Sequence, residues 1–347
     1  MNSDDRFAEG RHANDLDAGN GSAHEHPFAT LSPDWVLSAV ESTGRLCDGR
    51  MLALNSYENR VYQVGIEEGE PLIVKFYRPQ RWTREQILEE HGFMHELDLH
   101  ELPVVAPIAD ADGRTLQDFE GFMFALFPRR GGRSPDLDLD TLQVIGRTLG
   151  KLHGIGAGSR FRHRARLGVE SFAEASATFL LERDFIPADL RKAYETLARD
   201  LIRRVKQVFA ERRYAELRIH GDCHPGNVLW RDDIPYLVDF DDTMTGPAVQ
   251  DLWMLLSGTR EQQLAQLSEL IDGYDTFHSF APAELGLIEA LRTLRLMHYS
   301  AWLARRWDDP AFPRSFPWFN TPRYWSQHVL ELREQLAALD EPPLVLY

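Results

Sequence analysis

Cysteine is scarce in this chain: its 347 residues include only Cys47 and Cys223, which lie far apart in the sequence. Two isolated cysteines form neither a disulfide framework nor the paired spacing of a zinc site, so we expect a reducing compartment, the cytoplasm. The chain also lacks an apolar run of about eighteen residues and an apolar segment at its N-terminus. We therefore expect neither a membrane span nor a signal peptide.

Positive charge is also in short supply. Lysine and arginine number 38 against 54 aspartates and glutamates, which gives a formal net charge of −16. Such a surface repels phosphate backbones, so a nucleic acid is not expected as a partner. The length exceeds what one ordinary core needs, and the 43% hydrophobic composition is that of a globular protein, so we expect two lobes.

The pattern along the chain predicts an α+β, bilobal fold. Residues 1–28 hold almost no large apolar side chains and are expected to form a disordered acidic tail that is dispensable for chemistry. Residues 29–128 are expected to form a sheet-rich N-lobe and residues 129–347 a mostly helical C-lobe. In the N-lobe, helices are expected at 32–42 and 83–99, and strands at 51–54, 60–66, 71–77, 115–118 and 121–127. In the C-lobe, helices are expected at 139–153, within 184–213, and at 247–256, 261–277, 284–307 and 325–339.

The most informative segment is 218–242. Asp222 precedes Asn227 by five residues, and Asp239 ends a short apolar run. The catalytic loop of kinases has the same step from aspartate to asparagine, followed by a metal-binding aspartate. We expect Asp222 to accept a proton from the acceptor hydroxyl, and Asn227 and Asp239 to hold Mg²⁺ against the phosphates of ATP. A turn of polar residues would explain the spacing less well, because apolar segments flank it.

Lys75 lies in an apolar strand, as does the strand lysine of kinases that reaches the α- and β-phosphates. Its expected partner is a glutamate on the following helix. Glu89 and Glu90 are adjacent, so they point about 100° apart and only one can face the cleft. Glu90 follows the apolar stripe more closely, and we expect it to be the partner of Lys75.

The loop that should cover the phosphates, residues 55–60, has no G-x-G-x-x-G motif. Its small polar groups can donate to phosphate oxygens instead, with Ser56 as the first candidate and Asn59 as a second. The adenine is expected against the backbone near 126–128.

Four other features are assigned no catalytic role. Residues 146–151 resemble a Walker A motif but are too short and lie in a helical pattern. Cys223 stands between two histidines, yet the kinase loop explains its position. Asp241 and Asp242 are expected to be solvated or capping acids, although either could support the metal or bind a second one. Arg305 and Arg306 are expected to be solvated arginines at a helix end, although they could line the acceptor side.

With these residues in place, the chain resembles the aminoglycoside-phosphotransferase and choline-kinase branch of the protein-kinase-like superfamily, and in particular the stress response kinase A family. The resemblance runs from about residue 30 to the end and is carried by the blocks 54–62, 74–79, 86–91, 220–224, 246–256 and 309–313. Of these, 54–62 and 246–256 are the most specific, whereas His-Gly-Asp at 220–222 marks only the superfamily. It implies ATP contact at Ser56, a proton acceptor at Asp222, Mg²⁺ at Asn227 and Asp239, and serine/threonine protein phosphorylation in a cytoplasmic stress response.

The acceptor stays open at this stage. Too few residues separate Asp239 from the next expected helix for an activation loop, on which protein substrates of kinases usually dock. The sequence therefore allows a monomeric serine/threonine protein kinase, or a kinase of a small amino alcohol, sugar or antibiotic. A catalytically inactive binding module is a third interpretation, against which the retention of Lys75, Asp222, Asn227 and Asp239 argues.

Overall fold

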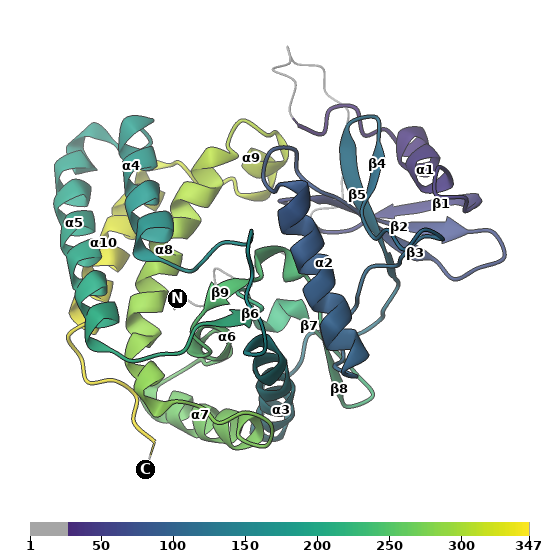
Figure 1. The fold of residues 1–347 in the computed structure, drawn as a ribbon. Helices are drawn as coiled ribbons and strands as arrows, with labels where there is room; N and C mark the ends of the chain where they lie inside the picture. The colour runs from purple at the N-terminus through teal and green to yellow at the C-terminus, as the bar shows by residue number, and fades with distance from the viewer. Residues whose placement is uncertain (1–26, 347) are drawn as a thin grey trace.

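A computed structural model describes residues 27–346 of the chain. It has the expected α+β, bilobal architecture, with a sheet in the N-lobe and mostly helices in the C-lobe (Figure 1). The disordered tail predicted for residues 1–28 falls almost wholly outside the described residues. No helix within 27–346 combines the length and the apolar character that crossing a membrane requires.

The N-lobe is built on one antiparallel sheet of five strands. Its spatial order is β1-β2-β3-β5-β4. The strands are β1 (Cys47–Ala53), β2 (Arg60–Ile66), β3 (Leu72–Phe76), β4 (Gln117–Phe119) and β5 (Phe122–Pro128). The strand β1 starts four residues before the expected Met51, because Cys47 pairs with Ile66 across an irregular register that the alternating pattern does not reveal.

Two helices accompany the sheet. The helix α1 (Pro33–Glu41) begins at Ser32, whose hydroxyl accepts from the Trp35 amide, with proline in its first turn. The helix α2 (Arg84–Leu99) begins with a capping box in which Thr83 and Gln86 satisfy each other's backbone amides. Figure 1 shows α2 lying between the sheet and the C-lobe, where a helix from the N-lobe can reach the cleft.

Within the described residues, the C-lobe is a set of helices around two short antiparallel strand pairs. Its helices are α3 (Leu139–Gly156), α4 (Ala175–Glu182), α5 (Ala188–Glu211), α6 (Val249–Trp253), α7 (Arg260–Tyr274), α8 (Ile288–Arg305), α9 (Ala311–Ser315) and α10 (Pro322–Ala338). Its strands are β6 (Leu217–Ile219), β7 (Val228–Arg231), β8 (Ile234–Leu237) and β9 (Met244–Gly246), with β6 paired to β9 and β7 to β8. The sequence did not indicate α4 and α9.

The glycines of the Walker-like segment have a packing function. Gly146 and Gly150 lie in α3, and a Cβ atom on either would collide with the backbone of α7 at Leu270 or Tyr274. They let two helices approach closely, which agrees with the rejection of a phosphate-binding motif.

The two lobes share one hydrophobic core. Ile87, Phe93, Met94 and Leu97 of α2 belong to the same buried cluster as the C-lobe helices. A second, smaller core lies on the other face of the sheet, under α1. The helix α2 thus packs with its sequence neighbours in the sheet and is also part of the C-lobe interior.

The predicted tail extends too far toward the sheet. Phe28 is 4% exposed and belongs to the smaller core, where its ring stacks on Phe122 at 6.1 Å. The guanidinium groups of Arg60 and Arg78 lie 4.5 and 5.3 Å from the centre of the same ring. The assignment of Phe28 to the tail is wrong because one aromatic residue in a polar segment gives no periodic signal.

A chain that starts at Thr30 should consequently be less stable than one that starts at Pro27. Loss of a buried phenylalanine side chain lowers the free energy of unfolding by about 3 kcal/mol or more. Urea unfolding of the two truncated chains would measure the difference, with Phe28→Ala in the full-length chain as a control. Equal stabilities would show that the Phe28 ring adds nothing to the N-lobe.

Candidate active site

The loop that carries Asp222 is held by a buried carboxylate. Asp251, at 0% exposure on α6, accepts from the backbone amides of His220 at 2.7 Å and Gly221 at 2.8 Å, and from His153 Nε2 at 3.0 Å. Gly221 has φ +87°, and a Cβ there would collide with the carbonyl oxygen of Asp242. Glycine is therefore required at the turn that presents Asp222 to the cleft.

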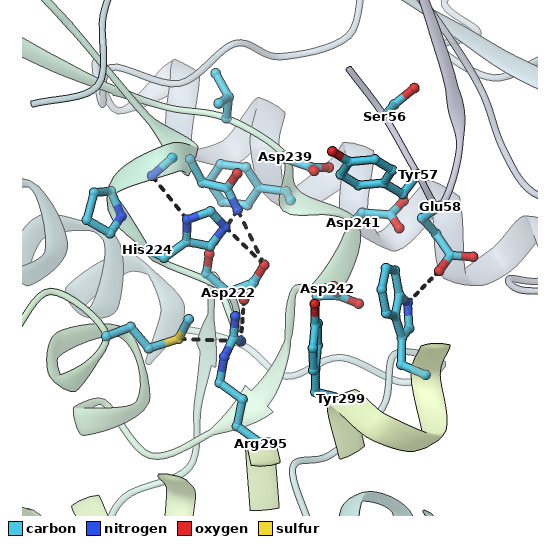
Figure 2. A pocket seen from close by; sticks show the side chains of 18 of the residues that line it. Ser56, Tyr57, Glu58, Asp222, His224, Asp239, Asp241, Asp242, Arg295 and Tyr299 are labelled. Atoms are coloured by element: carbon cyan, nitrogen blue, oxygen red, sulfur yellow. Dashed lines mark hydrogen bonds and ion pairs between the residues drawn. The ribbon is translucent and has the colours of Figure 1, made fainter. Parts of the chain in front are cut away.

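Asp222 faces the cleft beside a guanidinium group. Arg295 on α8 places Nη1 2.5 Å from Asp222 Oδ1, and His224 Nε2 lies 3.6 Å from Oδ2 (Figure 2). Burial alone would raise the pKa of Asp222, but Arg295 and then His224 outweigh it and hold that pKa well below its ordinary value. Asp222 is therefore a carboxylate at neutral pH.

Asn227 and Asp239 lie side by side at the open end of the β7–β8 hairpin. The Val238 amide donates to the Asn227 carbonyl oxygen at 3.0 Å, which brings the two flanking residues together. The Asn227 side chain donates to the Asp222 carbonyl oxygen at 2.9 Å, so its own amide oxygen is the atom that can face a cation. Asp239 has φ 60°, a left-handed conformation that is uncommon outside glycine and is often found at functional sites.

Lys75 is surrounded by three carboxylates. Its Nζ lies 2.9 Å from Asp241 Oδ1, 3.3 Å from Asp239 Oδ1 and 3.6 Å from Glu90 Oε1. Burial would lower the pKa of Lys75, but these carboxylates, Asp241 first, raise it well above its ordinary value. Burial raises the pKa of Glu90 to about 7, because Lys75 and Arg164 offset that burial only in part and the charge of Asp241 adds to it.

The two glutamates of α2 have different partners, and Lys75 pairs with Glu90. Glu89 instead accepts from the backbone amides of Arg162, His163 and Arg164, at 2.6 to 2.8 Å. Arg164 is itself 5% exposed and donates to the carbonyl oxygens of Asp241 and Thr243. It therefore ties the turn after Asp239 to α2.

Asp241 is not the solvated acid that the sequence suggested. It is 4% exposed, bonded to Lys75 and Arg81, and its pKa stays far below the ordinary value because these cations outweigh its burial. Asp242 keeps more exposure and lies 2.6 Å from Arg81 Nη2. The expectation for Asp241 is wrong because its partners come from the N-lobe, about 160 residues earlier in the chain.

Ser56 and Asn59 both line the cleft, although each also bonds within the N-lobe. The Ser56 hydroxyl accepts from the Val61 amide at 3.1 Å and so closes the loop between β1 and β2. Asn59, at 5% exposure, accepts from the Arg78 amide at 3.1 Å. A contact of either side chain with phosphate stays a prediction.

The cleft encloses about 1790 Å³ between the lobes. That volume exceeds the roughly 300–1,000 Å³ of a single small-ligand pocket, so it has room for a nucleotide and an acceptor. One part of its lining, which we call the apolar slot, consists of Val61, Ile73, Val105, Phe127, Leu229 and Val238. Another part consists of residues of α8 and aromatic side chains, namely Phe172, Tyr299, Trp302, Phe316 and Trp318.

The two arginines at the end of α8 differ in their surroundings. Arg305 is exposed, as expected, and donates to the Ala175 carbonyl oxygen. Arg306 is largely buried, and its Nε lies 2.5 Å from Glu58 Oε2. The expectation of a solvated group is wrong for Arg306, whose partner lies in the N-lobe loop.

Sequence reasoning missed Arg295, Arg164 and Arg81. Arg295 falls on the same face of α8 as Tyr299 and Trp302, and this spacing of four and seven residues was the available signal. Arg164 and Arg81 lie in irregular segments and carry no comparable signal. Cys223 is fully buried and burial raises the pKa of its thiol, which argues against a nucleophile.

Comparison with known proteins identifies the family of the chain. The model of the phosphotransferase enzyme family matches residues 51–288. Stress response kinase A of Shigella flexneri is 46% identical over 320 residues, which span 92% of this chain and 97% of that protein. Serine/threonine protein kinase RdoA of Salmonella typhimurium is 43% identical over the same shares.

Solved structures show the same fold at lower identity. Amicoumacin kinase hAmiN, in complex with AMP-PNP, Ca²⁺ and Ami, has a TM-score of 0.68 at 19% identity, covering 86% of this chain and 91% of that one. A microcompartment-associated aminopropanol kinase has a TM-score of 0.60 at 19% identity, covering 88% and 96%. On these matches, the chain belongs to the phosphotransferase enzyme family, in the group of the stress response kinase A proteins.

Proposed function

We propose that this enzyme transfers the γ-phosphoryl group of ATP to serine or threonine hydroxyls of proteins. The observation that carries the proposal is that Asp222, Asn227, Asp239 and Lys75 line one cleft between two lobes of a kinase fold. The protein acceptor is supported by the names of the relatives that are 43–46% identical, which include a serine/threonine protein kinase.

Asp222 is the proposed proton acceptor. As the acceptor oxygen forms a bond to the γ-phosphorus, the bond from phosphorus to the β–γ bridging oxygen breaks, ADP leaves, and the hydroxyl proton passes to the Asp222 carboxylate. Arg295 keeps that carboxylate ionised and fixes its direction. Lys75 and Ser56 are the proposed phosphate contacts, and the apolar slot beside Phe127 accepts the adenine.

Asn227 and Asp239 are the residues that would hold a divalent cation. No group of three or more histidine, cysteine, aspartate or glutamate side chains is placed to hold a metal anywhere in residues 27–346. Two protein oxygens fit Mg²⁺, because that ion keeps several waters and takes phosphate oxygens as its other ligands. Bound there, Mg²⁺ would neutralise charge on the phosphates of ATP.

Asp239→Asn should weaken the effect of Mg²⁺ on nucleotide binding by about tenfold or more, equivalent to 1.4 kcal/mol. Asparagine removes the charge and tolerates the left-handed backbone, whereas alanine would add strain. Calorimetry with AMP-PNP, with and without Mg²⁺, measures the effect, and exposed Asp340→Asn is the matched control. An unchanged Mg²⁺ effect would move the metal to another carboxylate, such as Asp241.

A small-molecule acceptor is the second candidate. Aromatic side chains line the proposed acceptor side of the cleft. Only a turn at Phe240–Asp242 and the strand β9 lie between Asp239 and α6, which leaves no room for a docking segment. An enclosed aromatic wall suits a compact hydroxyl compound as well as a peptide.

A labelled-ATP transfer assay separates the two candidates. The pure protein would be incubated with a cell lysate in one arm and with amino alcohols, sugars and aminoglycosides in the other. We expect labelled proteins with phosphoserine or phosphothreonine, absent with Asp222→Asn. Label in small molecules alone would refute the protein-kinase proposal, and no transfer in either arm would count against both.

A cytoplasmic role in stress is part of the proposal, supported by the relatives' names and by two unpaired cysteines.

A further inference from the structure

The N-lobe loop at residues 54–59 is fastened to the C-lobe by buried charged groups. Glu58 points away from Ser56 toward α8, and Figure 2 shows its carboxylate bonded to an indole of that helix. Its side chain is 11% exposed. We call this cluster the interlobe clasp; it consists of Glu58, Arg60, Arg78, Trp302, Arg306 and Asp309.

Glu58 joins the loop to α8. Its Oε2 accepts from Trp302 Nε1 at 2.7 Å and lies 2.5 Å from Arg306 Nε. Its Oε1 lies 3.0 Å from Arg78 Nε, in its own lobe. The neighbouring ring of Tyr57 packs on Phe316 of the α9 segment, with ring centres 4.9 Å apart.

Asp309 joins the end of α8 to the sheet. It is 3% exposed, and its Oδ2 lies 2.7 Å from Arg78 Nη2 and 3.2 Å from Arg60 Nη2. Arg78 therefore bridges both carboxylates of the clasp. Three of the sequence blocks that carry the family resemblance, 54–62, 74–79 and 309–313, meet at this one cluster.

These contacts join protein groups to one another, so none of them requires a nucleotide. Taking such charges out of water is costly unless each is paired, and removal of one partner leaves the others buried without compensation. A buried charge cluster is therefore weak evidence for stability as such and better evidence for a specified arrangement. The arrangement specified here sets the loop beside ATP against the helix beside the acceptor.

We propose that Glu58 is a positioning residue, which fastens the phosphate-side loop to α8 so that the loop is in place before ATP arrives. The inference rests on the proposed function, because it takes residues 54–59 as the loop that meets ATP. The same face of α8 carries Arg295, the partner of Asp222. The clasp thus fixes the position of ATP relative to the base through a single helix.

Distance measurements between spin labels can test the position of the loop. Ala53→Cys reports on the end of β1 next to the loop, and exposed Leu330→Cys reports on α10; Cys47→Ser removes the accessible native thiol, since Cys223 is buried. We expect one narrow distance distribution that AMP-PNP leaves unchanged. Glu58→Gln should broaden it, and AMP-PNP should narrow it again. A wild-type-like distribution in Glu58→Gln, or a wild-type distribution that narrows with AMP-PNP, would overturn the proposal.

Nucleotide affinity gives a second readout that a merely structural role would not move. If the loop is in place in only a fraction of the Glu58→Gln molecules, the affinity for AMP-PNP falls to that fraction of its wild-type value. We expect a loss of about tenfold, within the usual range of coupling. Arg306→Met should cause a similar loss, and the double variant no more than either single one, because both remove the same fastening. Exposed Glu70→Gln makes the same charge change and should match the wild type.

The outcomes separate this inference from the proposed function. Additive losses in the double variant, or unchanged affinity in Glu58→Gln, would refute the clasp while leaving the kinase assignment intact. Failure of the wild-type protein to bind AMP-PNP would instead refute the assignment of the loop to ATP, and the inference with it. Thermal unfolding of each variant shows whether the fold is retained, and Arg306→Lys, which keeps the charge, should recover part of the affinity.

Discussion

Asp222→Asn should lower kcat by about 10²–10⁴-fold, the usual effect of losing a general base. Affinity for ATP should stay within a factor of about three, because in the proposed arrangement Asp222 meets the acceptor hydroxyl and Lys75 meets the phosphates. The fold should be retained, since the loop is held by Asp251 through backbone amides and not by the Asp222 side chain. Single-turnover transfer with labelled ATP measures the first effect, and calorimetry the second.

The pH dependence of the same step gives a stricter check through Arg295. In the wild type, Arg295 holds the pKa of Asp222 low. Transfer should therefore persist to acid pH, until protonation of groups other than Asp222 stops it. Arg295→Met removes that cation, and burial then raises the pKa of Asp222. Because the carboxylate form is the active one, activity should be lost as pH falls through this higher value, which shifts the acid limb of kcat/KM upward by about one unit or more. An unmoved acid limb, or full activity in Asp222→Asn, would refute the role of Asp222.

Lys75→Met should abolish most transfer and also destabilise the protein. Removing one preorganised charge contact to the reacting groups typically costs about 10²–10³-fold in rate. The structure adds a second effect, because Asp241 and Glu90 would remain buried without their common partner. Breaking a buried ion pair in this way costs about 3–5 kcal/mol. The sequence gave no sign of this second effect, because nothing in it indicated that Asp241 is buried.

A paired substitution separates the two effects of Lys75. Glu90→Gln placed in Lys75→Met removes one uncompensated charge, so part of the stability should return while transfer stays lost. The stability loss of Lys75→Met should also be smaller at about pH 5 than at about pH 8. Burial already raises the pKa of Glu90 to about 7, and without Lys75 the folded state binds that proton more tightly, so stability is gained as pH falls. Full activity in Lys75→Met would show that another cation, such as Arg81, meets the phosphates.

The parts of the site that could be predicted from the sequence are those set by local spacing. The step from Asp222 to Asn227 belongs to one turn, and the choice of Glu90 over Glu89 follows from the geometry of one helix. The apolar pattern of the N-lobe segments likewise predicted its strands, apart from the irregular start of β1.

The parts that could not be predicted depend on partners far away in the chain. Arg295 reaches Asp222 across 73 residues, and Arg60 reaches Asp309 across 249. From sequence alone, an aspartate such as Asp241 is predicted to be solvated. Its burial depends on pairing with cations, and these lie elsewhere in the chain. The same holds for Arg306, whose surroundings are set by a glutamate in the other lobe.

The position of α2 limits how freely such enzymes can exchange parts during evolution. Because Phe93 and Leu97 pack inside the C-lobe core, an N-lobe recombined with the C-lobe of a distant relative would bring mismatched side-chain volumes into a close-packed interior. Neither lobe is a transferable module in this sense. The aromatic wall at α8 and α9 is subject to the same limit, because Phe316 belongs to the core that both lobes share and Trp302 packs against it.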